Sequence, residues 1–369
     1  FFFSSRRRHT RYLFSVVFIL GLALVLRSPG YVFVMYPVFI VATYIYTRIE
    51  EHSLIKRFGK KYRLYRKRVP LMIPRFIEIL RVIARPYFRR KLGVRIFNAE
   101  NIPASPPYFV VSSHRNYLDP FFISYALPHM VRHICTYEMF RKPTTALVLR
   151  WIGAIPKKRF KPDLKSTRQI MDALNKGFAI GVFPEGERSW TGAMQSFKHG
   201  SLKMFIHNND IPILPVIVEG NYHMWPRWSK KPMKSEVRIT IGEPIHVERN
   251  TDITQLESIL QQKTRPRQEA EMQMQCNTKD MIEKLSIVIY RCPNCKVLKM
   301  LTESHPNKLI CNSCGKAVVL KPNLSLNFGV DHSTQSESID SMYRKIRVTA
   351  TDIEKMTGAD DSSGFTLPE

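Results

Sequence analysis

The chain has 369 residues and a formal net charge of +27, from 57 lysines and arginines against 30 acidic residues. Its length allows more than one domain and a sizeable core. Its six cysteines, four of them in one cluster, argue against a disulfide scaffold and for a reducing compartment. The charge predicts an anionic partner, either nucleic acid or an acidic membrane surface with phosphate-bearing substrates.

Residues 1–11 are rich in arginine and begin with Phe1 rather than Met. They resemble a translated sequencing adaptor, with a genuine basic membrane flank as the alternative, and the chain can be a fragment. Two uncharged apolar runs follow at 12–26 and 31–46, and the turn between them contains Pro and Gly. They predict a helical membrane hairpin, with two buried core helices as the alternative. The basic run after it marks the cytoplasmic side, so we expect the inner membrane with the following domain in the cytoplasm.

Paired glutamates, Glu50 and Glu51, follow the hairpin, and Val69-Pro70 lies further on. Segment 12–70 resembles the carboxyl-terminal end of membrane methyltransferases related to isoprenylcysteine carboxyl methyltransferase and phospholipid methyltransferases. That resemblance implies S-adenosylmethionine binding by the two glutamates. The family's Arg-His-Pro-x-Tyr motif is absent from the sequence. We therefore interpret the segment as a truncated stub or a retained membrane anchor, with a solvated charged helix as the alternative.

Residues 72–92 combine apolar groups and arginines at near-helical spacing. This pattern predicts a basic amphipathic helix, either on an anionic bilayer or packed on the next domain. Strand-like and helix-like segments then alternate from Val94 to Val247, which predicts an α/β layered domain within 71–247. The strands are predicted at 108–111, 133–137, 178–183, 213–218 and 236–241. A helix is predicted from Asp163 to Lys176, closed by Gly177.

A histidine and a carboxylate five positions apart, His114 and Asp119, follow the first of these strands. Open α/β sheets place their sites at the carboxyl ends of strands. Pro120 predicts a helix from there to Ala126, with Asp119 as its N-cap, so that the two side chains meet on a turn. A carboxylate that holds the imidazole Nδ1 proton leaves Nε2 free as a general base. An isolated pair of this kind is a weak signal.

Two further blocks point to the same edge of the sheet. The strand 178–183 runs into a Pro and Gly turn that carries Glu185 and Arg188, and an upstream turn at 153–159 is cationic and ends with Arg159. With the apolar strand entry at 211–216, the order and separation of these blocks resemble the glycerolipid acyltransferase family. The resemblance covers about 75–247 and is greatest to 1-acylglycerol-3-phosphate acyltransferases.

This resemblance implies that His114 is the base and Asp119 its partner. The residues that it implies for binding the glycerol phosphate are Arg159, Glu185, Gly186 and Arg188. It further implies acyl transfer from acyl-CoA or acyl-carrier protein to a lysophospholipid, giving phosphatidic acid without a cofactor. Backbone N–H groups near Gly186 are expected to stabilise the oxyanion. For the acceptor, the alternative is another lyso-lipid. For the binding residues, the alternatives are that Arg188 and Glu185 simply pair with each other and that Arg159 is an exposed surface residue.

A predicted helical connector at 248–290 leads to a small module at 291–321, and the tail 322–369 offers a possible short helix near 342–347. The module contains two C-x-x-C knuckles whose spacing suits a tetrahedral zinc ribbon. The predicted zinc ligands are Cys292, Cys295, Cys311 and Cys314. Short strands are predicted at 296–301 and 317–320. A zinc ribbon on a basic chain also fits nucleic-acid binding, but no helix-turn-helix or ribonucleoprotein signature is visible, so nucleic acid is not the expected partner.

Overall fold

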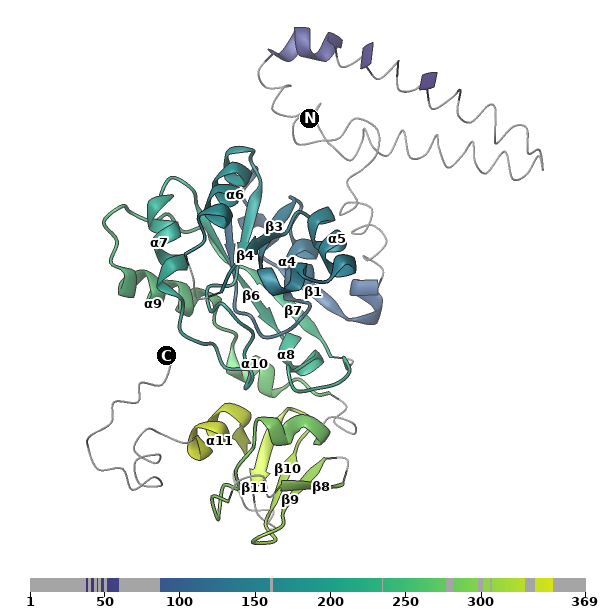
Figure 1. Ribbon diagram of the computed structural model, residues 1–369, viewed down its shortest axis with the longest axis vertical. Coiled ribbons are helices and arrows are strands. Elements are labelled where there is room, and N and C mark those ends of the chain that lie inside the picture. The colour runs from purple at the N-terminus through teal and green to yellow at the C-terminus, as the bar shows by residue number, and fades with distance from the viewer. Residues whose placement is uncertain are drawn as a thin grey trace, which may run out of the picture.

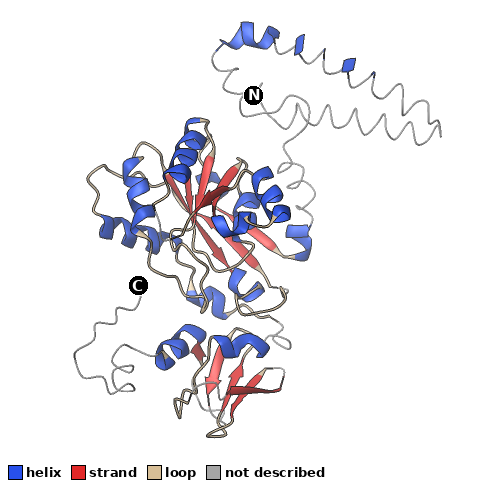
Figure 2. Cartoon of the chain, viewed as in Figure 1, coloured by secondary structure: helices blue, strands red, loops and turns tan. Residues whose placement is uncertain are grey.

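A seven-stranded sheet with helices on both faces forms the larger part of the molecule, and a five-stranded sheet forms a smaller part (Figure 1, Figure 2). The computed structural model describes residues 38, 41–42, 45, 48–49, 52–59, 87–159, 162–233, 235–276, 282–297, 301–305, 307–328 and 336–347. The α/β class predicted from the sequence is confirmed for the larger part.

Most N-terminal predictions lie outside the described residues, namely segment 1–11, nearly all of the apolar hairpin, and the pair Glu50 and Glu51. In the part of the chain that the structure describes, no helix is both long and apolar enough to cross a membrane. Of the helix predicted at 72–92, only the short η2 (Tyr87–Lys91) is described. Its Phe88 ring stacks on Tyr125 of α4 (Asp119–Ala126), so this end packs on the following domain.

The strand order in the large sheet is β1-β7-β6-β2-β5-β3-β4. The strands are β1 (Val94–Phe97), β2 (Phe109–Val111), β3 (Val131–Thr136), β4 (Ile155–Lys157), β5 (Ala179–Val182), β6 (Ile213–Glu219) and β7 (Val237–Ile241). All neighbours are parallel except the antiparallel pair β6 and β7. The five predicted strands are confirmed within a few residues. Strands β1 and β4 were not predicted, and β4 lies in the cationic segment that was expected to be a turn. It is a three-residue edge strand containing Pro156, so it lacks a long apolar run.

Helices cover both faces of this sheet, which explains why its central strands are apolar throughout. One face packs against α6 (Leu164–Asn175), α7 (His199–His207) and α9 (Ile253–Thr264), and the other against α4 and α8 (Asn221–Met224). The prediction of α6 is confirmed, since the Asp163 carboxylate caps its N-terminus and Gly177 follows its end with a φ of 71°. A short helix η3 (Ala99–Asn101) precedes β2, and η4 (Tyr137–Phe140) and α5 (Pro143–Trp151) lie between β3 and β4.

The segment predicted as a helical connector does contain helices, and its first helix, α9, also packs on the large sheet. The α9 side chains Leu256 and Leu260 are buried against the sheet, and α10 (Gln268–Met272) follows. The two leucines are four residues apart and so lie on one helix face. Two apolar positions among polar residues are too few for the sequence to indicate burial. Burial of each leucine stabilises the fold by roughly 1.5–3 kcal/mol.

The smaller part is an antiparallel sheet in the order β12-β11-β10-β9-β8. Its elements are η5 (Ile282–Ile287), β8 (Leu301–His305), β9 (Lys308–Cys311), β10 (Ala317–Leu320), β11 (Ser325–Phe328), β12 (Glu337–Ser338) and α11 (Ile339–Ile346). The strand predicted at 317–320 is confirmed. Of the strand predicted at 296–301, Lys296 and Val297 are not in a strand, Leu301 belongs to β8, and 298–300 lie outside the described residues. Lys296 has a φ of 60°, which bends the chain at the end of the first knuckle. The sheet also continues beyond residue 321 into the predicted tail.

Candidate active site

His114 lies just beyond the carboxyl end of β2, as the sequence predicted. Its Nδ1 is 2.9 Å from Oδ2 of Asp119, and the imidazole is 20% exposed whereas the Asp119 side chain is fully buried. The imidazole stacks on the Phe183 ring with centroids 4.3 Å apart and planes 22° apart. Among the described residues, none hydrogen-bonds Nε2 of His114. The arrangement therefore leaves one ring nitrogen oriented by a carboxylate and the other available to a substrate.

The prediction that Asp119 is the N-cap of α4 is wrong. Leu118 occupies that position, and no side chain caps the helix. The Asp119 carboxylate instead turns back toward the preceding loop, where Oδ2 accepts the backbone N–H groups of Arg115 and Asn116, both at 2.8 Å. Its other oxygen accepts from Nδ2 of Asn221 at 2.7 Å. Four donors, including His114, thus fix a carboxylate that has no contact with solvent.

Arg115 holds this loop in place through the contacts of its guanidinium. Its fully buried guanidinium donates to Val218 O and to Oδ1 of Asn221, each at 2.8 Å, and it pairs with both carboxylate oxygens of Glu271 on α10 at 2.6 and 2.8 Å. Burial alone lowers the pKa of Arg115, but Glu271 more than offsets it and the pKa is raised. Burial likewise opposes ionisation of Glu271, yet Arg115 holds the pKa of that carboxyl below its usual range.

Sequence reasoning missed Asn221 and Glu271. Both lie more than 100 residues from the His114 loop, outside any motif that the sequence analysis recognised, and Glu271 lies in the segment predicted as a connector. The position of Arg115 between His114 and Asp119 could have indicated a role at the site. An arginine in a loop is normally expected to be exposed, however, so its burial was not predicted.

Glu185 begins the turn after β5 and is fully buried. Its Oε1 accepts the backbone N–H of His114 at 2.9 Å and its Oε2 accepts that of Gln195 at 3.0 Å. Burial raises the pKa of Glu185 to about 7, although both N–H groups favour the ionised form. Ser189 N–H donates to the carbonyl of His114 at 2.9 Å. Glu185 therefore accepts backbone N–H groups and not Arg188, and the turn at 185–189 binds both the N–H and the carbonyl of His114.

Gly186 forms the tight turn itself. Its φ is 81°, in the region that favours glycine, and its N–H donates to Phe183 O at 3.1 Å. That N–H is therefore engaged in the turn, so the oxyanion donor predicted near Gly186 has to be a different backbone N–H.

Three arginines gather beside the pair. Arg188 is half-buried with its guanidinium 4.7 Å above the Tyr117 ring. Its pKa is lowered, first by burial, then by the positive charge of Arg227 and more weakly by that of Arg159, while Asp119 opposes this. The charges of Arg227, Arg159 and Asp119 therefore all act on Arg188. Guanidinium groups that act on one region in this way can bind an anion with several oxygens.

Arg227 is the member of this group that sequence reasoning missed, because it lies in a loop beyond the matching blocks. Its Nη1 donates to Arg188 O at 2.8 Å and lies 3.4 Å from a carboxylate oxygen of Glu187. Its guanidinium also stacks over the Trp190 ring at 4.1 Å. These contacts fix Arg227 next to the Arg188 backbone, where its positive charge lowers the pKa of Arg188.

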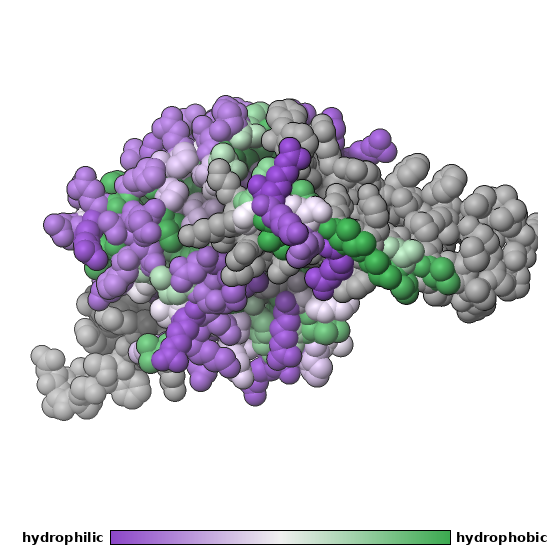
Figure 3. Space-filling view, turned by 90° about the horizontal axis from the view of Figure 1, so that it is seen from above, coloured by the Kyte–Doolittle hydropathy of each residue, from purple (hydrophilic) through white to green (hydrophobic). Residues whose placement is uncertain are grey.

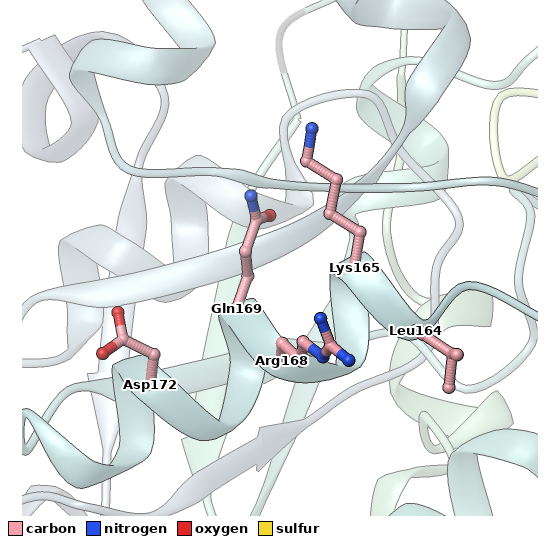
Figure 4. Close-up of a pocket in the computed structure, with 5 residues that line it drawn as sticks. All are labelled: Leu164, Lys165, Arg168, Gln169 and Asp172. Atoms are coloured by element: carbon pink, nitrogen blue, oxygen red, sulfur yellow. The ribbon is translucent and has the colours of Figure 1, made fainter.

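A shallow depression of about 580 Å³ lies elsewhere, along the outer face of α6 (Figure 4). Its lining residues are Leu164, Lys165, Arg168, Gln169 and Asp172. All five belong to one exposed helix face, and none belongs to the His114 loop or the arginine group. The depression therefore takes no part in the chemistry described above.

The four cysteines of the small sheet come together as the knuckle spacing predicted. Their sulfur atoms all lie within 4.8 Å of one another, with Cys292 to Cys314 at 3.7 Å and Cys295 to Cys311 at 3.5 Å. A tetrahedral zinc site with Zn–S bonds of about 2.3 Å places its sulfur atoms roughly 3.8 Å apart. The donor set and its spacing therefore fit a four-thiolate metal ion.

Comparison with known proteins gives the same picture for the larger part. Residues 93–219 match the family model described as Acyltransferase. The chain is 26% identical over 156 residues to 1-acyl-sn-glycerol-3-phosphate acyltransferase of Bacillus subtilis, covering 42% of this chain and 74% of that protein. It is 29% identical over 157 residues to the chloroplast enzyme of that name from Arabidopsis thaliana, covering 42% of this chain and 44% of that protein. The chain thus spans less than half the length of the plant relative.

A crystal structure of the 1-acyl-sn-glycerophosphate acyltransferase of Thermotoga maritima aligns with a TM-score of 0.45 and 21% identity, covering 71% of this chain and 95% of that one. The family match includes the His114 loop, Arg159 and the Glu185 turn. Residues 93–219 therefore form an acyltransferase domain, and the chain that carries it is an O-acyltransferase related to the 1-acylglycerol-3-phosphate enzymes.

Proposed function

We propose that this enzyme transfers a fatty acyl group from the thioester of acyl-CoA or acyl-carrier protein to the free hydroxyl of 1-acylglycerol-3-phosphate, giving phosphatidic acid. The observation that carries the proposal is the His114–Asp119 pair, with Nε2 of His114 free of described partners, beside the group Arg159, Arg188 and Arg227. A general base and an anion site in one place suit an acceptor that carries both a hydroxyl and a phosphate.

In the proposed reaction, the hydroxyl oxygen of the acceptor attacks the thioester carbonyl, and Nε2 of His114 takes the proton of that hydroxyl. Asp119 stabilises the imidazolium that forms and keeps its ring oriented. The carbon–sulfur bond then breaks, and the imidazolium returns the proton to the leaving thiolate. Atoms balance without a metal or redox partner, and no covalent acyl-enzyme is required.

The phosphate is assigned to the arginines. Arg188 is held in place by Tyr117, and Arg227 is braced by Trp190 and Glu187, so their guanidinium groups are oriented before the ligand arrives. Preorganised, partly desolvated donors bind a dianion more tightly than mobile lysines do. Glu185 and Gly186 support the loop and the turn in this proposal and do not contact the phosphate, which refines the roles expected from the sequence.

The test of this function is a panel of acceptors offered to the purified full chain with acyl-CoA or acyl-carrier protein, with the products identified by mass. The expected product is phosphatidic acid from 1-acylglycerol-3-phosphate, formed faster than the corresponding product from any neutral acceptor. Transfer only to an acceptor without phosphate, such as monoacylglycerol, would contradict the assignment of the arginines.

Membrane association is the proposed setting, with the catalytic domain on the cytoplasmic side. Helix α5 exposes Leu147, Val148 and Trp151 on one face, each about half accessible to solvent, while Ala146 and Leu149 are buried. Basic residues lie at both ends of that helix, namely Arg141 and Lys142 before it and Arg150 in its last turn. Seen from above, the molecule carries apolar groups among predominantly hydrophilic ones (Figure 3). An apolar face with a basic rim is complementary to an anionic lipid surface, the source of the acceptor.

For the cysteine module we propose structural zinc. Cys292 and Cys311 are buried, and the short sulfur separations suit a closed four-thiolate site with no open position for substrate. This ion would hold the small sheet together and take no part in the acyl-transfer steps.

A further inference from the structure

The cysteine module and the acyltransferase domain share one hydrophobic cluster. Tyr222 and Trp228 of the acyltransferase domain are 5% and 1% exposed and pack in the same cluster as Cys292 and Cys311, two of the four thiolate ligands of the proposed zinc site. In Figure 1 the small sheet lies next to α8 and α10. A module of this size, with a small core of its own, depends on its metal ion to stay folded. Folding of the cysteine module therefore affects the packing around Tyr222.

Tyr222 in turn contacts residues 190–192, which follow the Glu185 turn of the active site. Its hydroxyl accepts from Nε1 of Trp228 and donates to Trp190 O, each at 2.9 Å. Its ring lies against Gly192 so closely that a Cβ at that glycine would be 2.7 Å from it. Residues 189–192 follow the Glu185 turn and begin with Ser189, whose N–H holds the carbonyl of His114. The tyrosine thus connects the shared cluster to the His114 loop.

Two polar contacts cross directly between the parts. Oγ1 of Thr191 donates to Oδ1 of Asp340, at the N-terminus of α11, at 2.8 Å. The Nε2 of His223 lies 3.1 Å from Asn323 O, to which it donates as N–H. Both partners in the module stand between or beside its strands, so their positions follow its fold.

The same short helix reaches the catalytic carboxylate. Helix α8 has four residues, all of them buried. At successive positions Asn221 holds Asp119, Tyr222 enters the shared cluster, and His223 contacts the module. A displacement of the module would move Tyr222 and His223. Asn221 is next to Tyr222 in the chain, so its hydrogen bond to Asp119 would be disturbed.

We propose that the metal-loaded cysteine module positions the active site, so that the state of the four-cysteine site sets the rate of acyl transfer at a distance. Tyr222, Thr191 and Asn221 are the positioning residues through which it acts. Loss of the metal ion loosens the module, residues 189–192 and α8 lose their support, and the His114–Asp119 geometry relaxes. The activity part of this inference rests on the proposed acyl transfer.

The first experiment removes zinc from the full chain with a chelator and measures bound metal, kcat and KM for 1-acylglycerol-3-phosphate. The expected result is a fall in kcat of about tenfold or more with a much smaller change in KM, and recovery on adding Zn²⁺ but not Mg²⁺. A metal-depleted protein with unchanged kcat overturns the proposal, and so does a wild-type protein that binds no zinc.

The second experiment cuts the connection while the metal stays bound. Tyr222→Phe removes the hydroxyl bridge and Thr191→Val removes the bond to Asp340, and the double variant is expected to retain zinc and lose about tenfold in kcat. Cys135→Ser is the matched control for cysteine replacement, since that thiol lies on β3 outside the cluster, and Cys295→Ser is expected to reproduce the chelated state. Full activity of the double variant overturns the proposed route.

Amide hydrogen exchange separates this inference from the proposed function. On zinc removal, residues 189–192 and 221–224 are expected to exchange faster, while α6 stays unchanged. If no lipid of the acceptor panel is acylated, the proposed function fails, yet faster exchange in these two segments still supports the coupling. Unchanged exchange in both segments after zinc removal contradicts the coupling whatever the substrate is.

Discussion

Among single residues, the proposed base His114 depends most on Asp119, a buried carboxylate that accepts four hydrogen bonds. Asp119 receives its donors from His114, two loop amides and Asn221, so its orientation is fixed before substrate arrives. An ionised carboxylate in this position favours the imidazolium that forms when His114 takes a proton, and this stabilisation has to be strongest in the transition state.

Asp119→Asn is therefore expected to lower kcat by roughly 10²–10⁴-fold with little change in KM, because the amide removes the charge that stabilises imidazolium. Steady-state kinetics with 1-acylglycerol-3-phosphate measures this, and circular dichroism checks the fold. Asp172→Asn on the exposed face of α6 is the matched control and keeps wild-type activity. Equal kcat for both variants would show that Asp119 is not the partner of a catalytic base.

The arginine group predicts a different kinetic signature. Arg188→Ala is expected to raise KM for 1-acylglycerol-3-phosphate by about 10–100-fold, since a charge-assisted contact to phosphate contributes about 1.5–3 kcal/mol. Arg188→Lys recovers only part of this because the guanidinium fork is lost. Arg168→Ala on α6 is the control. A neutral acceptor serves as internal reference, and an equal loss for phosphate-bearing and neutral acceptors would contradict the assignment.

At the scale of elements, strand β3 carries a buried histidine behind the active site. His133 stacks toward Phe183, its Nε2 contacts Oγ of Ser124, and its Nδ1 lies against Gly181 without a described partner. Burial, and then the neighbouring His114, lower the pKa of His133 to about 3 from an ordinary value of 6.5. The folded protein therefore keeps this ring neutral in the range where the unfolded chain protonates it.

Between pH 6.5 and 3 the unfolded state binds more protons at this position, so the free energy of unfolding falls as pH falls, by at most about 1.4 kcal/mol per pH unit. His133→Asn removes this contribution, although it costs stability at neutral pH. Urea unfolding at pH 7 and pH 5 measures the slope in both proteins. The account predicts a smaller loss on acidification for the variant, and an equal loss would contradict a neutral buried His133.

Elements with a strong local signal could be predicted from the sequence. The apolar strands β2, β5 and β6 and the capped helix α6 are where the pattern put them, because their side chains are buried on both faces or follow one helical stripe. The edge strand β4 could not be predicted, since its three residues include Pro156 and Lys157 and leave no apolar run. For the site, the His114–Asp119 contact followed from spacing, whereas Asn221, Arg227 and Glu271 depend on tertiary contacts between distant segments.

At the scale of the whole molecule, the exposed face of α5 predicts contact with lipid. Vesicles of anionic phospholipid carrying brominated acyl chains are expected to quench part of the tryptophan fluorescence of the full chain, because Trp151 enters the apolar layer. Trp151→Phe should lose this part of the quenching and Trp225→Phe should retain it. Equal quenching in the two variants would place the lipid contact elsewhere, and neutral vesicles test the contribution of the basic rim.

The charge of the whole chain is consistent with this setting. The net charge of +27 includes Arg188, Arg227 and the basic residues beside α5, and a charge of this sign suits both the proposed lipid surface and the proposed phosphate-bearing acceptor. The cysteine module adds a second part whose contacts, through Tyr222 and Thr191, end at the loop that holds His114.

The most direct test of the central claim is the rate of phosphatidic acid formation from 1-acylglycerol-3-phosphate by the wild-type chain and by His114→Ala. We expect that the variant folds, still binds the phosphate-bearing acceptor, and loses at least about 10³-fold in kcat, because it lacks the proposed general base. Undiminished turnover by a folded His114→Ala protein would contradict it.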